Sequence, residues 1–153
     1  MEIRELTVAD VPSLLELYTQ LDETNIGLPV EKSVELWREE IAANKNIKYF
    51  GAVDGGKVVA TCYCVIIPNL TNHNQPICFI ENVVTDNAYR KQGLGRKVIE
   101  KAVETAKANH CYKVILQSGL KRKEAHQFYE KMGFNGESKK AFDMRLSYPA
   151  DEQ

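Results

Sequence analysis

The sequence predicts an α/β fold in which helices cover both faces of a mixed sheet, with the elements in the order βααβββαβαβ. Two observations predict this fold class. Some segments repeat apolar residues at the helical period, whereas others alternate them or run continuously apolar, as strands do. The turn Asp54-Gly55-Gly56 lies between two strand-like segments, which indicates a β-hairpin.

The first part of the chain predicts a strand and two helices. Residues 2–7 have the pattern of the strand. Thr7 is placed to cap the first helix, with Asp10 in the capping-box position and Pro12 in the first turn. A loop at 25–29 leads to the second helix, whose apolar positions are Val30, Val34, Trp37 and Ile41.

Strands and helices alternate through the rest of the chain. The run Cys78–Val84 is apolar at nearly every position, which is typical of a central strand buried on both faces. No repeat, low-complexity tract or linker interrupts the pattern, so we expect one domain over residues 1–153. We expect strands at 47–53, 57–67, 77–85, 112–117 and 140–148, and helices at 94–109 and 123–132.

A glycine-containing loop joins the central strand to the helix that follows it. The loop reads Arg90-Lys91-Gln92-Gly93-Leu94-Gly95-Arg96, and we call it the anion cradle. The first amides of a helix are unpaired and lie at the positive end of its dipole, so together with nearby cations they favour a phosphate or pyrophosphate. A dinucleotide fingerprint would need a glycine at Val98, and a P-loop would need Lys-Ser or Lys-Thr after Gly95. An ordinary solvated loop remains the alternative.

Composition limits the classes of binding partner and the cellular compartment that we expect. The net charge of −1 argues against a general nucleic-acid or membrane-surface binder, and basic residues gather instead at 90–97 and 121–123, which favours a small anionic ligand. The chain opens without an apolar signal region and has no run of membrane-spanning length, so a cytoplasmic location is expected. The cysteines lack zinc spacing, so we expect reduced thiols and no metal site at Cys62, Cys64, Cys78 and Cys111.

Two motifs point to a known family. RxxGxG occupies 90–95 after the central strand, and A-x-x-F-Y-x-x-x-G-F occupies 125–134 on the last predicted helix. With the order of elements, they resemble the GCN5-related N-acetyltransferase (GNAT) superfamily over essentially the whole chain. Within it, residues 79–84, 111–116 and 128–134 are similar to glucosamine-6-phosphate N-acetyltransferases. The chain departs from that group at 118–122, where the group has an acidic, Asn-containing turn.

The resemblance implies that acetyl-CoA is the cosubstrate. Its pyrophosphate would lie on the anion cradle, that is on Arg90, Lys91, Gln92, Gly93, Leu94, Gly95 and Arg96. In the family the preceding strand carries a bulge and splays from the next strand, and the pantetheine arm binds the exposed backbone, here at Val83, Val84 and Thr85. Arg122 stands where many members have an asparagine that contacts CoA, and it either reaches the adenosine phosphates or only decorates the helix start.

The resemblance also implies catalytic roles. Tyr129 matches the tyrosine that assists the departing thiolate, although a plain core aromatic is the alternative. Glu81 interrupts the apolar central strand, so a partly desolvated carboxylate there is the candidate general base, acting directly or through a water. A structural carboxylate is the competing interpretation of Glu81. His126 faces away from Tyr129 on the helix and is not expected to be a base.

The function expected from these residues is transfer of the acetyl group of acetyl-CoA to a primary amine of a small molecule, by direct attack in a ternary complex. A protein or peptide N-acetyltransferase and a non-catalytic acyl-CoA-binding sensor remain alternatives. Candidate substrate positions are Tyr18, Asp22, Glu23, Trp37 and the loop 68–76. Homodimers are common in the family, so a homodimer is left open.

Overall fold

The computed structural model describes residues 1–147. The chain divides into two compact units, Met1–Leu116 and Gln117–Gln153, and each is described by itself. One domain over the whole chain stays a prediction. None of the described helices is both long and apolar enough to cross a bilayer.

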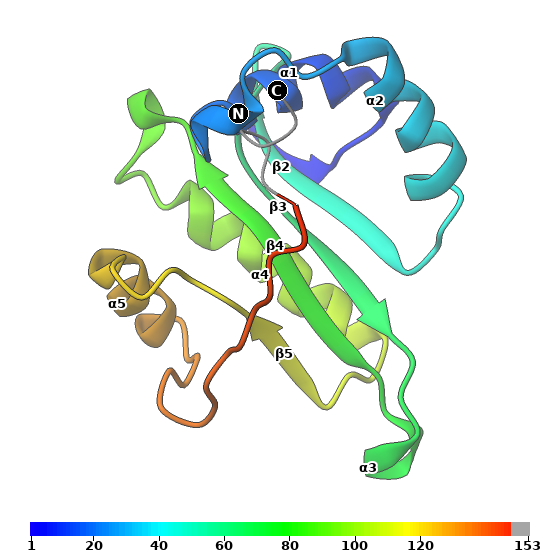
Figure 1. Cartoon of the computed structure of the whole chain (residues 1–153), viewed down its shortest axis with the longest axis vertical. Helices are drawn as coiled ribbons and strands as arrows, with labels where there is room; N and C mark the ends of the chain where they lie inside the picture. Colours follow the sequence, from blue (N-terminus) through cyan, green and yellow to red (C-terminus); the bar gives the residue numbers. More distant parts are fainter. Residues whose placement is uncertain (148–153) are drawn as a thin grey trace. The chain divides into compact units, whose positions relative to one another are not determined.

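The first unit is built on a five-stranded mixed sheet (Figure 1). Each strand pairs with the next in chain order, antiparallel from β1 to β4 and parallel between β4 and β5. The hairpin predicted at Asp54-Gly55-Gly56 joins β2 to β3, and both glycines have positive φ. The strands are β1 (Glu2–Glu5), β2 (Ile47–Asp54), β3 (Lys57–Ile67), β4 (Ile77–Thr85) and β5 (Lys113–Leu116).

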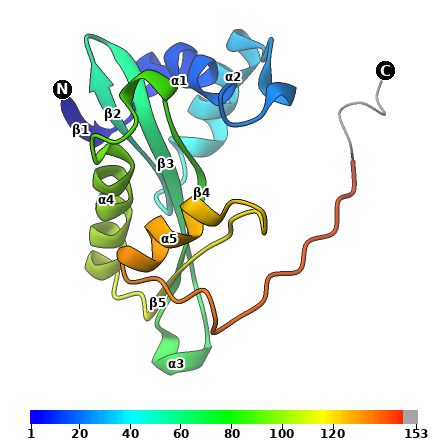
Figure 2. The same cartoon turned by 90° about the vertical axis from the view of Figure 1, so that its left-hand side faces the viewer.

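Helices cover both faces of this sheet, as the sequence predicts. The long helix α4 (Leu94–Ala108) lies on one face, and α1 (Val11–Tyr18) and α2 (Val30–Leu36) lie on the other (Figure 2). The second predicted helix does not run unbroken through its apolar positions, because α2 passes into a π-turn at Trp37. The short elements are η1 (Val8–Asp10), η2 (Glu23–Asn25), the π-turn η3 (Trp37–Ile41), the left-handed turn α3 (Thr71–Asn74) and η4 (Asn87–Tyr89).

The predicted capping box fixes the start of the first helical segment. The Thr7 amide donates to Asp10 Oδ2 at 2.8 Å, and Arg4 holds both oxygens of that carboxylate at 2.7 and 2.9 Å. The hydrogen bonds from Arg4 lower the pKa of the buried Asp10 carboxyl, and the Thr7 amide adds to the effect. A buried charge is thereby paired and hydrogen-bonded, which offsets its desolvation.

Two apolar layers fill the space on the two sides of the sheet. On the α4 side, Cys62 Sγ donates to the Val98 carbonyl at 3.4 Å, and burial raises the pKa of Cys62 to about 12. All four cysteines are free in the structure, and Cys62, Cys64 and Cys78 are buried among apolar residues. The layer under α1 and α2 contains Leu6, Val11, Leu14, Leu17, Trp37, Val53, Val58 and Val84.

The central strand β4 carries a bulge and then leaves its neighbour. Thr61 pairs with Val84 and Tyr63 pairs with Glu81, so two residues of β4 face one residue of β3. Asn82, inside the bulge, has a φ of 51°. Pairing of β4 with β5 ends at Ile80 and Leu116, and β4 continues past the end of β5 (Figure 1). The bulge and the splay that the family resemblance implies are therefore present.

The second unit contains one described helix, α5 (Lys123–Lys131). Gly133, with a φ of 104°, follows the end of this helix. The predicted closing strand at 140–148 is wrong for residues 140–147, which form no strand, while residue 148 lies outside the described residues. The segment has the alternation of a strand, but no described strand supplies ladder hydrogen bonds to it. Its alternate apolar side chains are 85%, 84% and 90% exposed at Phe142, Met144 and Leu146.

Candidate active site

The start of α4 forms an open, positively polarised surface. Gly93 is the residue before the helix and has a φ of 75°, which few residues other than glycine adopt without strain. A Cβ placed there would meet nothing within 4 Å. The first backbone hydrogen bond at this end runs from the Lys97 amide to the Gly93 carbonyl at 3.2 Å, so the amides of the first helical turn are available to a ligand.

The cationic side chains of the anion cradle are exposed, and most of them have no ion-pair partner among residues 1–147. Arg96 is paired with Glu100 at 2.8 Å. Within residues 1–147, neither Arg90 nor Lys91 makes a side-chain hydrogen bond or ion pair. Lys91 also has a positive φ of 63°, so two residues of this short loop hold left-handed backbone. Free amides, free cations and an unfilled space above Gly93 fit a pyrophosphate.

The turn before the cradle is held by a buried carboxylate that sequence reasoning missed. Asp86 accepts a hydrogen bond from the Ala88 amide at 2.9 Å and pairs with Lys57 at 3.1 Å. The Ala88 amide, with Lys57 beside it, lowers the pKa of Asp86. Tyr89 donates to Asp54 at 2.8 Å and fixes the other side of the turn. An Asp followed two residues later by the amide it binds is an Asx turn, which is the signal that could have identified Asp86.

The splayed part of β4 offers backbone groups on its free edge. Val84 and Thr85 pair with β3 on one side, while no described strand pairs with them on the β5 side. A strand edge of this kind leaves N–H and C=O groups that a ligand with amide groups can pair with. The residues expected to hold the pantetheine arm, Val83–Thr85, therefore lie on an edge suited to it, directly before the turn that leads to the cradle.

Glu81 is the last residue of β4 before the bulge, and it is half-buried. It sits opposite Tyr63 in the register of the sheet. Burial, and then the negative charge of Glu81, raises the pKa of the Tyr63 hydroxyl. No hydrogen bond or ion pair engages the Glu81 carboxylate in the part of the chain that the structure describes. The candidate base is thus near the free edge and is not tied up in a salt bridge.

Next to Glu81, three aromatic side chains contact one another in series. The rings of Tyr63 and Tyr49 stack with centroids 4.5 Å apart and planes at 11°, and Trp37 lies 4.9 Å from Tyr49. We call Trp37, Tyr49 and Tyr63 the aromatic row. The Tyr18 hydroxyl from α1 is buried and completes no hydrogen bond among the described residues. Burial raises the pKa of Tyr18, and the nearby Asn82 side chain opposes that effect.

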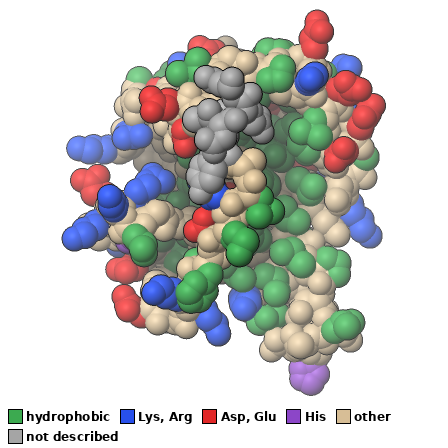
Figure 3. Space-filling view, viewed as in Figure 1, with side chains coloured by type: hydrophobic (Ala, Val, Ile, Leu, Met, Phe, Trp, Pro, Cys, Tyr) green, Lys and Arg blue, Asp and Glu red, His purple; other side chains and the backbone are tan. Residues whose placement is uncertain are grey.

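The sheet face that carries the aromatic row is the one opposite α4. Hydrophobic side chains gather on this face over β3 and β4 (Figure 3). Val65 and Phe79, the next register pair on the same face as Tyr63 and Glu81, are half-buried. The carboxylate of Glu81 therefore lies among aromatic and apolar neighbours, a setting that strengthens its interactions with any cation.

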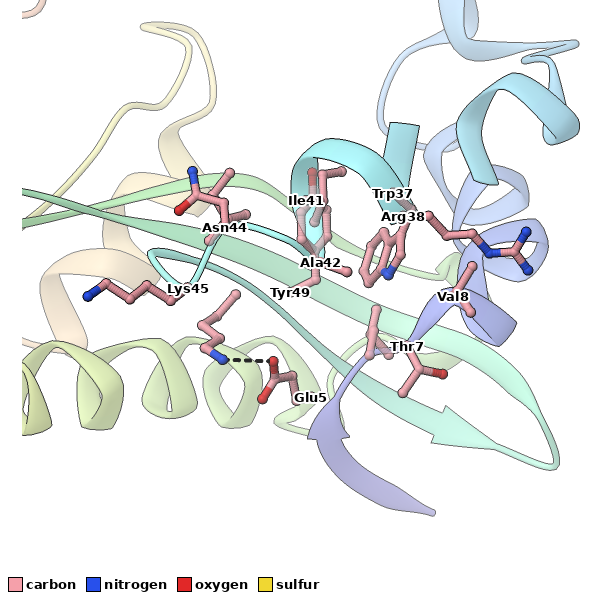
Figure 4. Close-up of a pocket in the computed structure, with 13 residues that line it drawn as sticks. Glu5, Thr7, Val8, Trp37, Arg38, Ile41, Ala42, Asn44, Lys45 and Tyr49 are labelled. Atoms are coloured by element: carbon pink, nitrogen blue, oxygen red, sulfur yellow. Dashed lines mark hydrogen bonds and ion pairs between the residues drawn. The ribbon is translucent and has the colours of Figure 1, made fainter. Parts of the chain in front are cut away.

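A cavity of about 370 Å³ lies at the other end of the aromatic row (Figure 4). Trp37 and Tyr49 form part of its wall, and Arg38 and Lys45 also line it. None of the residues predicted to bind the cosubstrate or to act in catalysis lines it. This cavity is therefore separate from the anion cradle and from Glu81.

The other residues predicted to act in catalysis or to hold CoA, Tyr129 and Arg122, belong to the second unit. Tyr129 is 8% exposed on α5, with Phe128 and Phe134 at centroid distances of 5.3 and 6.1 Å. Arg122 is the residue before α5. His126 Nε2 lies 2.8 Å from the Gly119 carbonyl oxygen, a contact within the unit. The first unit brings together Glu81, Val83–Thr85 and the cradle, while the roles of Tyr129 and Arg122 stay predictions.

Comparisons with known proteins agree on one family. A family model described as the acetyltransferase (GNAT) family matches residues 12–134. A glucosamine 6-phosphate N-acetyltransferase of Trypanosoma brucei brucei is 33% identical over 148 residues, 95% of each chain. The crystal structure of the enzyme of that name from Arabidopsis thaliana has a TM-score of 0.78 at 30% identity, covering 96% of this chain and 97% of that one.

A further solved structure is more similar in shape. It comes from Agrobacterium tumefaciens str. C58, is provisionally described as an acetyltransferase, and has a TM-score of 0.89 at 38% identity. The match covers 95% of this chain and 100% of that one. The two motifs that suggested the family thus lie within a similarity that spans nearly the full chain.

Proposed function

The chain belongs to the GNAT family and is an acetyl-CoA-dependent N-acetyltransferase, and from this premise we propose that it acetylates a primary amine of a small molecule. The observation that carries the proposal is the free edge of β4, which has the unpaired Glu81 at its bulge and leads into the anion cradle. Two relatives that match nearly the full chain are named for an amino sugar phosphate, which supports a small amine as acceptor.

We assign the parts of acetyl-CoA to this edge and the cradle. The amides and cations of Arg90–Arg96 would hold the pyrophosphate, and the backbone of Val83–Thr85 would pair with the pantetheine arm. The Val83 amide would polarise the thioester carbonyl. Arg122 is the candidate for an additional phosphate contact, from the family position that it occupies.

The transfer needs a base and a proton donor. An amine is protonated in water, so Glu81 accepts a proton from the acceptor nitrogen, directly or through a water. The nitrogen lone pair forms a bond to the thioester carbon, and the C–S bond breaks with its electron pair going to sulfur. The second proton that nitrogen must lose leaves to solvent water, and Glu81 returns its own proton to solvent afterwards. Tyr129 donates its hydroxyl proton to that thiolate, following the role of the family's tyrosine, and water restores the proton. The products are the acetamide and CoA, with no covalent enzyme intermediate.

The deciding experiment measures thiol release from acetyl-CoA by the purified protein. The panel contains glucosamine 6-phosphate, aminoalkylphosphonates, polyamines and N-terminal peptides. We expect turnover with at least one small amine, and a large loss of kcat in Glu81→Gln but not in Glu104→Gln, an exposed carboxylate on α4. Turnover with peptides alone would replace the proposal by a protein N-acetyltransferase. CoA binding without turnover of any amine would replace it by a sensor.

A homodimer and a cytoplasmic location remain predictions. The exposed apolar side chains of Phe142, Met144 and Leu146 support a second copy as partner, because large apolar side chains exposed this close together in the chain are often covered by a partner.

A further inference from the structure

Tyr63 stands between a ring and a carboxylate on one face of the sheet. Its register partner on β2 is Tyr49, and its register partner on β4 is Glu81. Directly opposed residues in antiparallel strands have Cβ atoms roughly 4.5–5.5 Å apart, so Tyr63 is the immediate neighbour of both Tyr49 and Glu81. They come from three consecutive strands of a sheet that is anchored on both faces, which makes the arrangement rigid.

The two sides of the Tyr63 ring are not equivalent. One side is covered by Tyr49, since the two rings are nearly parallel at 11° and 4.5 Å. The other side is not stacked on an aromatic ring among residues 1–147, and Glu81 is the register neighbour of Tyr63 on β4. Glu81 is half-buried and, among residues 1–147, has neither a cation nor a hydrogen-bond donor on its carboxylate. A half-buried carboxylate beside an aromatic face gains most when a cation lies between them.

We propose that the face of the Tyr63 ring that does not stack on Tyr49 and the carboxylate of Glu81 form the subsite for the ammonium group of the acceptor. The inference rests on the proposed function, because the bound cation is the amine that is to be acetylated. Tyr63 is then a specificity residue, which selects acceptors that arrive as an ammonium ion over neutral molecules of the same shape. Tyr49 supports it from behind by fixing the plane of the ring.

Tyr63 and Glu81 together can stabilise the acceptor nitrogen at both stages at which it is positively charged, on binding and during attack. The ammonium ion is attracted by the ring quadrupole and by the carboxylate when it binds. After Glu81 has accepted a proton, the neutral nitrogen attacks and acquires a positive charge again as the C–N bond forms. The ring stabilises that charge until the second nitrogen proton leaves to solvent water. Tyr63 therefore acts at the nitrogen, whereas the anion cradle acts on the cosubstrate.

Ligand binding tests the subsite without turnover. The probes are propylammonium and propan-1-ol, which have the same number of heavy atoms and differ in charge. In protein labelled at tyrosine ring carbons, we expect propylammonium to shift the Tyr63 resonance saturably, and propan-1-ol not to do so. Glu81→Gln should weaken propylammonium binding roughly tenfold or more, as loss of a charged partner does. Equal shifts with both probes, or binding unchanged in Glu81→Gln, would overturn the subsite.

Graded fluorination of the ring tests the cation–π contact without altering its shape. Phenylalanine, 4-fluoro-, 3,5-difluoro- and 3,4,5-trifluorophenylalanine at position 63 progressively remove negative charge from the ring face. We expect the KM for the best amine and the Kd for propylammonium to rise stepwise, roughly tenfold across the series. The same series at Tyr112, whose ring already lies 5.3 Å from Lys113 Nζ, is the control and should change neither constant. A flat series at position 63 would refute the inference.

Failure of the inference is distinguishable from failure of the proposed function. Amine acetylation with a flat fluorination series would remove Tyr63 from the subsite while the enzyme assignment stands. A stepwise series in propylammonium binding, without acetylation of any amine, would support the subsite and refute the proposed function.

Discussion

Replacing Gly93 by alanine separates backbone strain from loss of the anion cradle. At a φ of 75° a Cβ costs roughly 1–2 kcal/mol, and nothing lies within 4 Å to add a steric clash. For a chain of this length that strain lowers Tm by about 2–8 °C. Gly56→Ala in the β2–β3 hairpin is the matched control, because Gly56 has a φ of 81° and equally open surroundings.

The two variants should differ in CoA binding. The methyl group at position 93 occupies the space that a phosphate needs to approach the helix amides. Hydrogen bonds to a charged group contribute about 1.5–3 kcal/mol each, so losing even one raises the Kd for CoA roughly tenfold or more. Calorimetric titration with CoA and thermal unfolding measure both quantities. Similar losses of Tm with equal CoA affinity in the two variants would show that the cradle does not bind the cosubstrate.

Three other predictions concern catalysis, acid stability and assembly. Tyr129→Phe should lower kcat by roughly ten- to a thousandfold with little change in the KM for acetyl-CoA, and an unchanged kcat in steady-state assays would exclude the proton-donor role. The pKa of Asp10 is lowered in the folded state by Arg4, so its stabilisation is present above the unfolded pKa of 3.8 and is lost as the pH falls through the lower folded value. Urea unfolding should therefore give Asp10→Asn a shallower acid loss of stability than the wild type, and parallel curves would contradict the linkage. Sedimentation should detect a dimer that dissociates when the exposed residues Phe142, Met144 and Leu146 are replaced by serine. A monomeric wild type would refute the assembly.

Local signals predicted most of the fold, because they depend on neighbours in the chain. The Thr7–Asp10 cap, the Asp54–Gly56 hairpin and the glycine at the start of α4 each depend on a few adjacent residues, and each is present. The strand expected at 140–148 failed for the opposite reason. Its alternation is a local property, whereas a strand exists only when another strand pairs with it.

The site was predictable only in part, because its geometry depends on register. The sequence identified Glu81 and the cradle, but nothing in it places Tyr63 opposite Glu81, since that pairing follows from how β3 and β4 align. The spacing of apolar residues likewise does not predict the left-handed Asn82 in the bulge or the π-turn at Trp37. Asp86 could have been found from its Asx turn, whereas the aromatic row could not.

Because β4 separates from β5, the stability of the folded chain should also depend on the concentration of the ligand that binds the free edge. A ligand arm that lies along the free edge completes hydrogen bonds that the folded chain alone leaves to water. Any ligand that binds only the folded state adds RT ln(1 + [L]/Kd), about 2.7 kcal/mol when its concentration is 100 times the Kd. The amides of Val83–Thr85 should then exchange slowly with solvent when CoA thioesters are abundant and quickly when they are scarce. The lifetime of the folded enzyme against proteolysis would rise and fall with the same pool.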